Sequence, residues 1–247
     1  MRRASSLALT TLLAAALAFP GPGYAACKGT LYLTLDTSNM SQAENIARIL
    51  ARQHVQATFF VANEKTVRGD YSLDSSWAAY WQARVAEGHA FGTHTWDHGY
   101  FRGDLPDGKV RYVRAGRTRE LDAKGVCEEL RRVETRFREL TGRGLEPIWR
   151  APGGRTTPNA LAAAKACGYR HVHWSQAGFL GDELPSDKYP NDMLLARALN
   201  NLRDGDIMVM HLGIQSRKDP LAHILEALLA GLKERGFCFA TLAEAKP

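Results

Sequence analysis

The chain has 247 residues, 45% of them hydrophobic and 23% charged, a balance typical of a globular protein and not of a disordered or fibrous one. Its 32 basic and 26 acidic residues give a formal net charge of +6. With no basic run longer than two residues, this modest excess argues against nucleic acid as a partner. Weak attraction to an anionic polymer and a solvated basic surface without a partner both remain open.

Residues 1–26 have the pattern of a secretory signal peptide. Two arginines precede the apolar stretch Leu7–Phe19, and the small residues of "GYAAC" provide a cleavage site near Ala25 or Ala26. The stretch is too short for a membrane span, and no later run approaches about 20 apolar residues. We therefore expect an exported protein, periplasmic or secreted, without a stable membrane span.

Cleavage would leave a single domain, residues 27–247, and the loss of the two leader arginines would lower the net charge from +6 to +4. About 220 residues suit one large α/β domain better than two small ones. A lipoprotein signal ending at Cys27 is the alternative. It is disfavoured because Tyr24 stands where such signals usually have an aliphatic residue.

Four cysteines remain after cleavage: Cys27, Cys127, Cys167 and Cys238. Disulfides persist in an oxidising compartment, so two bridges are expected, and the sequence leaves three connectivities open. Cys27 opens the first predicted strand and Cys238 lies in the last, so these two meet if the sheet closes on itself. Their wide spacing argues against a cysteine metal site.

The first half of the mature chain alternates between predicted strands and helices. Hydrophobic patterning predicts strands at 31–36, 55–62 and 90–95, and helices at 41–54 and 75–89. Ser41 and Glu44 have the spacing of a capping box at the start of the first helix. The basic stretch Phe101–Gly116 is rich in Gly and Asp and is expected to be an irregular surface excursion.

The alternation continues in the second half. A helix is predicted around Val126–Leu140, with apolar residues at steps of three and four. Thr157 is the expected cap of the next helix, which has Pro158 in its first turn and Gly168 as its stop. The remaining predictions are strands at 147–154, 169–175, 206–212 and 237–242, and helices at 191–202 and 219–236, the last capped by Asp219.

Seven or eight strands alternating with helices imply a mostly parallel sheet, because each helix is the crossover that a parallel pair requires. A (β/α) barrel, distorted or incomplete, competes with an open doubly wound sheet. The polar candidate residues follow strands throughout the chain, at the C-terminal ends where barrel enzymes build their sites. No G-x-G-x-x-G follows the first strand to support a dinucleotide fold. We therefore expect the barrel.

Several potential catalytic side chains occupy these strand ends. They are Asp36 at the end of the first strand, His94 and His98 following the third, Arg150 with "APGG" at the end of the next, Trp174 and Ser175 at the end of another, and His211 at the end of "IMVMH". If the strands close a ring, these residues share one cavity.

At these positions the chain resembles the NodB-homology polysaccharide deacetylases, carbohydrate esterase family 4. Four family motifs occur in order as "TLDTS" (Thr34 to Ser38), "HTWDH" (His94 to His98), "RAP" (Arg150 to Pro152) and "VMH" (Val209 to His211). The family's D-x-x-D-W motif is matched only loosely by "HWSQAGFLGDE". The resemblance covers nearly the whole mature chain and implies a (β/α) barrel of the NodB-homology type.

The resemblance also implies a metal site. Asp36 takes the place of the catalytic base, and His94 and His98 take the places of two metal ligands. The third ligand position, an aspartate in the family, holds Thr37, a much poorer zinc ligand. Three outcomes remain open: two histidines hold the metal with extra water, Asp36 swings in to bind it, or the site lacks a functional metal.

The other implied roles complete an amide hydrolase. Arg150 would pair with the base, His211 would be the general acid, and the backbone N–H of Gly153 would bind the oxyanion. Asp182 is the candidate that orients His211. Trp174 and Val209 would line a slot for the acetyl methyl group. Gly153 also departs from the family, in which an aromatic residue commonly follows the proline, and this predicts an open wall of the pocket.

The expected function is metal-assisted hydrolysis of N-acetyl groups on an amino-sugar polysaccharide, either peptidoglycan or an exopolysaccharide. The expected cofactor is a divalent metal, zinc first, and the expected partner is the carbohydrate polymer itself. A non-catalytic glycan-binding module with a degenerate site is one alternative. A related hydrolase of small-molecule C–N bonds is the other.

Overall fold

The computed structural model describes residues 27–245. The predicted signal peptide, residues 1–26, lies outside the described part of the chain. Within residues 27–245, no helix is long and apolar enough to cross a membrane.

A seven-stranded parallel sheet forms the centre of the fold, with β1 (Gly29–Asp36) in its middle. Residues 34–36 of β1 pair with β2, residues 32–36 with β9, and residues 29–31 with β10. The sheet continues from β2 through β3 and β7 to β8. The other six strands are β2 (Thr58–Val61), β3 (Ala90–Thr93), β7 (Ile148–Trp149), β8 (Arg170–His171), β9 (Ile207–His211) and β10 (Phe237–Phe239).

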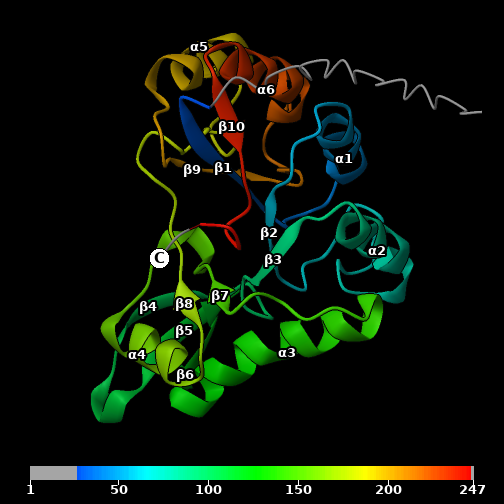
Figure 1. The fold of residues 1–247 in the computed structure, drawn as a ribbon. Coiled ribbons are helices and arrows are strands. Elements are labelled where there is room, and N and C mark those ends of the chain that lie inside the picture. The colour runs from blue at the N-terminus through cyan, green and yellow to red at the C-terminus, as the bar shows by residue number, and fades with distance from the viewer. Residues whose placement is uncertain (1–26, 246–247) are drawn as a thin grey trace, which may run out of the picture.

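The sheet curves into an incomplete barrel (Figure 1). Beyond β8 the chain returns alongside β9, where Phe179 forms a parallel bridge with Val209. The N–H of Ser175 donates to the carbonyl of Ile207 over 3.1 Å, which extends this contact. The expectation of a distorted or incomplete (β/α) barrel is confirmed, with the carboxyl ends of the parallel strands at one rim.

Helices surround the outer face of the sheet (Figure 1). Their apolar faces bury a core that includes Phe59, Trp81 and Phe91, together with Phe137 from α3. Trp81 contacts Phe59, Phe91 and Phe137 edge to face. The helices are α1 (Ala43–Arg52), α2 (Ala78–Ala86), α3 (Ala123–Thr141), α4 (Pro158–Ala166), α5 (Asn191–Asn201) and α6 (Leu225–Glu234), with 3₁₀ turns η1 (Ser75–Trp77), η2 (Pro106–Gly108), η3 (Pro152–Gly154) and η4 (Leu221–Ile224).

The expected irregular excursion at Phe101–Gly116 is wrong, because this region is part of a second sheet. The strands β4 (Tyr100–Asp104), β5 (Val110–Arg114) and β6 (Arg117–Leu121) form a three-stranded antiparallel sheet. In β5, the buried Val110 and Tyr112 alternate with arginines. This period-two pattern indicates a strand with one buried face, and the Gly and Asp residues belong to its turns.

Two expected helix caps are also wrong. Helix α1 begins after Gln42, whose side chain makes no capping hydrogen bond, so Ser41 and Glu44 do not form a capping box. The last predicted helix divides into η4 and α6, and η4 begins after Pro220. Asp219 instead contacts the ring of His223 at 2.9 Å.

The predicted cap of α4 is confirmed, because the Thr157 hydroxyl accepts a hydrogen bond from the N–H of Ala160 over 3.2 Å. Replacing Thr157 with alanine should lower the free energy of unfolding by about 1 kcal/mol, since this helix N–H then lacks its partner. Urea denaturation measures the change. Thr157→Ser, which keeps the hydroxyl, is the matched control and should stay close to wild type; an equal loss in both variants would contradict the capping role.

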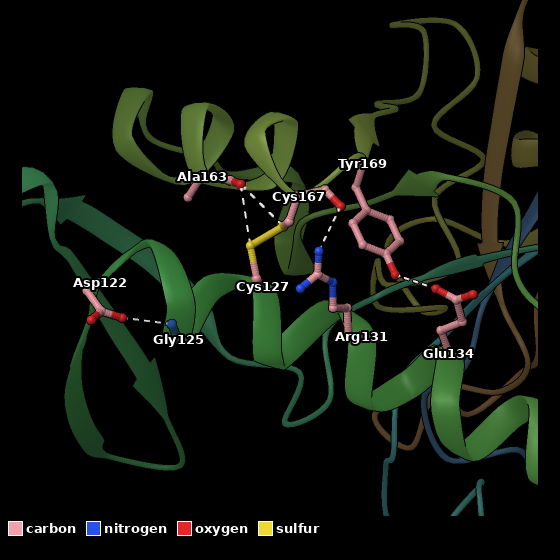
Figure 2. Close-up of a disulfide and its surroundings, with 8 residues drawn as sticks. All are labelled: Asp122, Gly125, Cys127, Arg131, Glu134, Ala163, Cys167 and Tyr169. Carbon is pink, nitrogen blue, oxygen red and sulfur yellow. Dashed lines mark hydrogen bonds between the residues drawn. A yellow bond between two sulfur atoms is a disulfide. The ribbon is translucent and has the colours of Figure 1, made fainter.

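Two disulfides connect distant parts of the described chain. Cys27 is bonded to Cys238, which links the start of β1 to β10 as expected for neighbouring strands. Cys127 on α3 is bonded to Cys167 at the end of α4 (Figure 2). Beside this second bridge, Arg131 of α3 donates to the Cys167 carbonyl. The structure thus selects one of the three connectivities that the sequence left open.

Candidate active site at the carboxyl ends of the strands

A cavity of about 180 Å³ opens at the carboxyl ends of β1 and β9. Six of the residues singled out from the sequence line it: Asp36, His98, Gly153, Trp174, Val209 and His211. Its other lining residues are Ser38, Tyr100, Phe179, Glu183 and Ile214. His94, Thr37 and Arg150 are buried close beneath the wall, with exposures of 0 to 1%. The strands therefore bring the predicted side chains together.

Asp36 and Arg150 form a buried ion pair at the base of the site. Arg150 Nη1 donates to Asp36 Oδ1 over 2.8 Å and to the Thr34 hydroxyl over 2.7 Å. Burial alone would raise the pKa of Asp36, but the positive charges of Arg150 and His211 hold it below its usual value. Asp36 is consequently a carboxylate at neutral pH, as a general base requires.

His94 and His98 face this carboxylate from the segment after β3, and their ring centroids are 4.9 Å apart. His94 Nδ1 contacts the Arg150 carbonyl oxygen at 2.9 Å, and Nε2 lies 3.6 Å from Asp36 Oδ2. Burial lowers the pKa of His94, and it lowers the pKa of His98 to about 4. Both imidazoles are therefore neutral at pH 7, the form that binds metals.

The loops that present these groups have unusual backbone conformations. Thr95 and His98 have φ angles of 67° and 49°, and Ser38 and Met40 after β1 have φ angles of 60° and 61°. Side chains other than glycine rarely adopt this left-handed region, and such residues cluster at functional sites. The loops after β1 and β3, which contain two of the family-like motifs, each have two such residues.

Thr37 lies beside Glu64, which the sequence analysis did not single out. The Thr37 hydroxyl donates to Glu64 Oε2 over 2.8 Å and accepts from the N–H of Ala62 over 3.1 Å. Glu64 Oε2 also accepts from the N–H of Ser38 over 2.6 Å, while Oε1 lies 3.6 Å from His98 Nδ1. A carboxylate therefore reaches the side of the site where Thr37 lacks one.

His211 lies at the end of β9, next to Asp182 as anticipated. The backbone N–H of His211 donates to Asp182 Oδ2 over 2.6 Å, and the ring Nδ1 lies 3.1 Å from the same oxygen. Burial lowers the pKa of His211, but Asp182 outweighs burial and raises the pKa to about 10. His211 is therefore an imidazolium at neutral pH, suited to donate a proton.

The wall at Gly153 is not open as expected, because Tyr100 of β4 covers it. A side chain at Gly153 would place its Cβ 2.8 Å from the Tyr100 ring, and one at Gly154 would meet Trp174 at 2.6 Å. Gly153 also has a φ of 64°. The glycines are thus required by aromatic rings that come from other segments of the chain.

Three further residues, Asp97, His89 and His171, lie outside the chemistry. Asp97 contacts Arg119, with its Oδ2 3.3 Å from Arg119 Nη2, and does not hold His98. The rings of His89 and His171 accept backbone N–H groups from Ala57 and Ala151. These two histidines therefore serve the fold.

The sequence offered a signal for the carboxylates that it missed. Glu64 follows β2 by three residues, while Asp36 ends β1 and His94 directly follows β3, so the same strand-end reasoning selects it. Glu183 directly follows Asp182, and its Oε1 lies 3.9 Å from His211 Nε2. Tyr100 and Phe179 gave no comparable signal, since their places depend on the second sheet and on the return along β9.

The side chains around His94 and His98 offer donor atoms for a divalent cation. Within residues 27–245, no three His, Cys, Asp or Glu side chains already converge as a complete metal-binding cluster. The donors nevertheless suit zinc or cobalt: neutral imidazoles from His94 and His98 beside the carboxylates of Asp36 and Glu64. The residues present therefore fit a divalent cation after side-chain adjustment.

Comparison with known proteins agrees with this geometry. The family described as "Polysaccharide deacetylase" matches residues 23–172. A chitooligosaccharide deacetylase from Bradyrhizobium sp. (strain ANU 289) is 26% identical over 219 residues, which is 84% of this chain and 86% of the relative.

Solved structures share the fold. A family 4 acetyl xylan esterase from Clostridium thermocellum, in complex with a cobalt ion, has a TM-score of 0.67 and 21% identity over 87% of this chain and 89% of its own. A CE4 family pseudoenzyme from Bacillus anthracis has a TM-score of 0.66 and 17% identity over 88% of this chain and 65% of its own. Because the matching family model spans more than half of the sequence, the chain belongs to the polysaccharide deacetylase family.

Proposed function

We propose that the protein is an exported hydrolase that removes N-acetyl groups from an amino-sugar polymer. The observation that supports this best is the meeting of a buried, Arg-paired carboxylate with an imidazolium in one cavity. Asp36 provides the base and His211 the acid. Amide hydrolysis needs both, because water must lose a proton and the leaving amine must gain one.

The polymer is proposed to be peptidoglycan or an exopolysaccharide. Family membership and the similar chitooligosaccharide deacetylase favour an acetylated amino-sugar chain as substrate. Two disulfides in the described chain favour an oxidising compartment, in line with the expected signal peptide. The polymer would lie across the strand ends, with one acetamido group in the cavity.

In the proposed reaction, Asp36 accepts a proton from the attacking water, and Arg150 keeps Asp36 ionised and fixed in direction. The N–H of Gly153 donates to the developing oxyanion. His211, oriented by Asp182, gives its proton to the departing nitrogen. Trp174 and Val209 enclose the acetyl methyl group. A divalent cation held by His94 and His98 would polarise the carbonyl and lower the pKa of a water.

A second candidate is a glycan-binding module without turnover. It is favoured by one observation, the neutral Thr37 at the position where the family has a metal-binding carboxylate. The similar fold of a CE4 pseudoenzyme shows that this architecture exists without its usual activity. A hydrolase of small-molecule amides, the third reading, would use the same base and acid but would need no polymer groove.

Acetate release separates the three readings. The purified protein should release acetate from N-acetylated chitooligosaccharide, with the Asp36→Asn variant as the blank. Binding of the oligosaccharide without acetate release would favour the module. Hydrolysis of small amides without any action on oligosaccharide would favour the third reading.

The pairing of His211 with Asp182 predicts a pH profile. Because the pKa of His211 is about 10, kcat/KM should fall on the alkaline side only near that pH. Asp182→Asn removes the carboxylate that raises the pKa of His211, while burial still lowers that pKa. The alkaline limb should therefore move to neutral pH or below. The stability that the pair contributes should be present below the ordinary histidine pKa of about 6.5 and lost as pH rises through about 10.

The matched control is Glu183→Gln, because Glu183 Oε1 lies 3.9 Å from His211 Nε2 and makes no hydrogen bond to it. Its profile should move only slightly. An unchanged alkaline limb in Asp182→Asn would contradict the role of Asp182 in holding the proton on His211.

A further inference from the structure

We infer that Glu64 is the third protein ligand of a divalent-cation site completed by His94 and His98, in place of the carboxylate absent at Thr37. The inference rests on the proposed function and deepens it, since it names a third ligand that none of the three outcomes left open by the sequence includes. The cation site is then a relocated one and not a degraded one. Thr37 acts as a positioning residue for Glu64.

The placement of the Glu64 carboxylate supports its role as a ligand. Glu64 follows β2, the neighbour of β1, and its side chain is only 11% exposed. The Thr37 hydroxyl and the Ser38 N–H both donate to Oε2. Oε1 takes neither of these bonds and is turned toward His98. A buried carboxylate fixed by one oxygen, with the other facing an imidazole, is arranged as a ligand.

The spacing of the donor atoms also supports a cation site. Glu64 Oε1 lies 3.6 Å from His98 Nδ1, and Asp36 Oδ2 lies 3.6 Å from His94 Nε2. These distances are too long for hydrogen bonds. Ligands at about 2.0–2.2 Å from a tetrahedral zinc ion are about 3.3–3.6 Å from one another. Glu64 and His98 are therefore spaced as two neighbouring ligands of one ion would be, while Asp36 borders the ligand His94 as the proposed base.

The tautomer of His94 leaves one ring nitrogen free to bind a cation. Its Nδ1 lies 2.9 Å from the Arg150 carbonyl oxygen, which can only accept, so Nδ1 has the hydrogen and Nε2 has the lone pair. Nε2 is the nitrogen turned toward the Asp36 carboxylate. A metal-binding histidine commonly donates its other N–H to a carbonyl in this way.

The net charge of the proposed ligand set matches that of the family's. Two neutral histidines with Glu64 give a ligand charge of −1, the same as two histidines with an aspartate. An aspartate at position 37 would bring a second carboxylate against Glu64, whose Oε2 lies 2.8 Å from the Thr37 hydroxyl. Like charges at that distance repel. The threonine at 37 and the glutamate at 64 are therefore complementary, and only one of the two positions can provide the carboxylate.

Isothermal titration of chelator-treated protein with zinc tests the inference without substrate. Wild type should bind one zinc ion, and Glu64→Gln should bind it more than about 100-fold more weakly, because even partners outside the ligand set are worth about 10- to 100-fold. Glutamine keeps an oxygen to accept from Thr37 and Ser38, and circular dichroism checks that the variant folds. Glu183→Gln removes a carboxylate of the cavity that lies beside His211, and it should keep wild-type affinity.

A double variant tests the exchange of positions. Thr37→Asp combined with Glu64→Gln should regain most of the lost zinc affinity, whereas Thr37→Asp alone should gain little over wild type. Equal affinity of wild type and Glu64→Gln would overturn the inference, as would a wild type that binds no zinc. Acetate release by a protein that binds no zinc would overturn this inference alone. Glu64-dependent zinc binding without acetate release would overturn the proposed function alone.

Discussion

Replacing Asp36 with asparagine is expected to lower kcat for acetate release by about 10²- to 10⁴-fold, the usual contribution of a general base. Asparagine keeps the shape of the side chain and an oxygen that can accept from Arg150, but it cannot take a proton from water. Acetate release from N-acetylated chitooligosaccharide, per mole of folded protein, measures the effect. Normalisation is needed because the charge of Arg150 is left buried without its partner.

Asp97→Asn is the matched control for this substitution. Asp97 precedes the candidate ligand His98 but forms its ion pair with Arg119, away from the cavity. The control should retain nearly wild-type kcat. Turnover by Asp36→Asn within tenfold of wild type would show that another group takes the proton from the attacking water.

Replacing Arg150 with methionine is expected to have the largest effect on stability. Arg150 is fully buried and donates to Asp36, so its loss leaves a carboxylate in the interior without a counter-charge. Removing one partner of such a pair typically lowers the free energy of unfolding by about 3–5 kcal/mol. Urea denaturation at pH 7 measures this loss, and acetate release should disappear with it.

The pH dependence of this loss has a definite sign. In the wild type, the lowered pKa of Asp36 contributes stability that is present above the ordinary pKa of 3.8 and is lost as pH falls through the lowered value. Without Arg150, burial raises the pKa of Asp36, and the protonated form tolerates burial. The deficit of Arg150→Met should therefore be largest at neutral pH and shrink in acid.

Two further variants complete the test of the ion pair. The double variant Asp36→Asn with Arg150→Met should be more stable at pH 7 than Arg150→Met alone, because no charge remains unpaired. Arg52→Met breaks an exposed ion pair with Glu226 and should behave like wild type. Equal losses from Arg150→Met at acid and neutral pH would show that packing, and not charge, accounts for its effect.

The sequence was sufficient to predict the barrel and most of the cavity because one physical rule links them. Parallel strands end at the same rim, so polar residues that follow different strands meet there. Asp36 and His211 end strands with apolar runs, His98 follows another, and all three line the cavity. The pairing of Cys27 with Cys238 was favoured on a related ground, because closure of the sheet makes the first and last strands neighbours.

The features that the sequence analysis missed depend on contacts between segments without such a rule. Tyr100 covers Gly153 because β4 belongs to a second sheet, whose alternating Val110 and Tyr112 were obscured by glycines and charges in its turns. Glu64 obeys the strand-end rule. Glu64 lies outside the family motifs, however. The motifs alone therefore indicate the loss of a metal-binding carboxylate at Thr37 and do not select Glu64.

The decisive measurement is the time course of acetate release from N-acetylated chitooligosaccharide by chelator-treated protein, before and after one equivalent of zinc or cobalt. Little release is expected before addition and sustained release after it, with no release by Asp36→Asn under either condition. Binding of the oligosaccharide with no acetate at any metal concentration would contradict the central claim that these strand-end residues form a working hydrolytic centre.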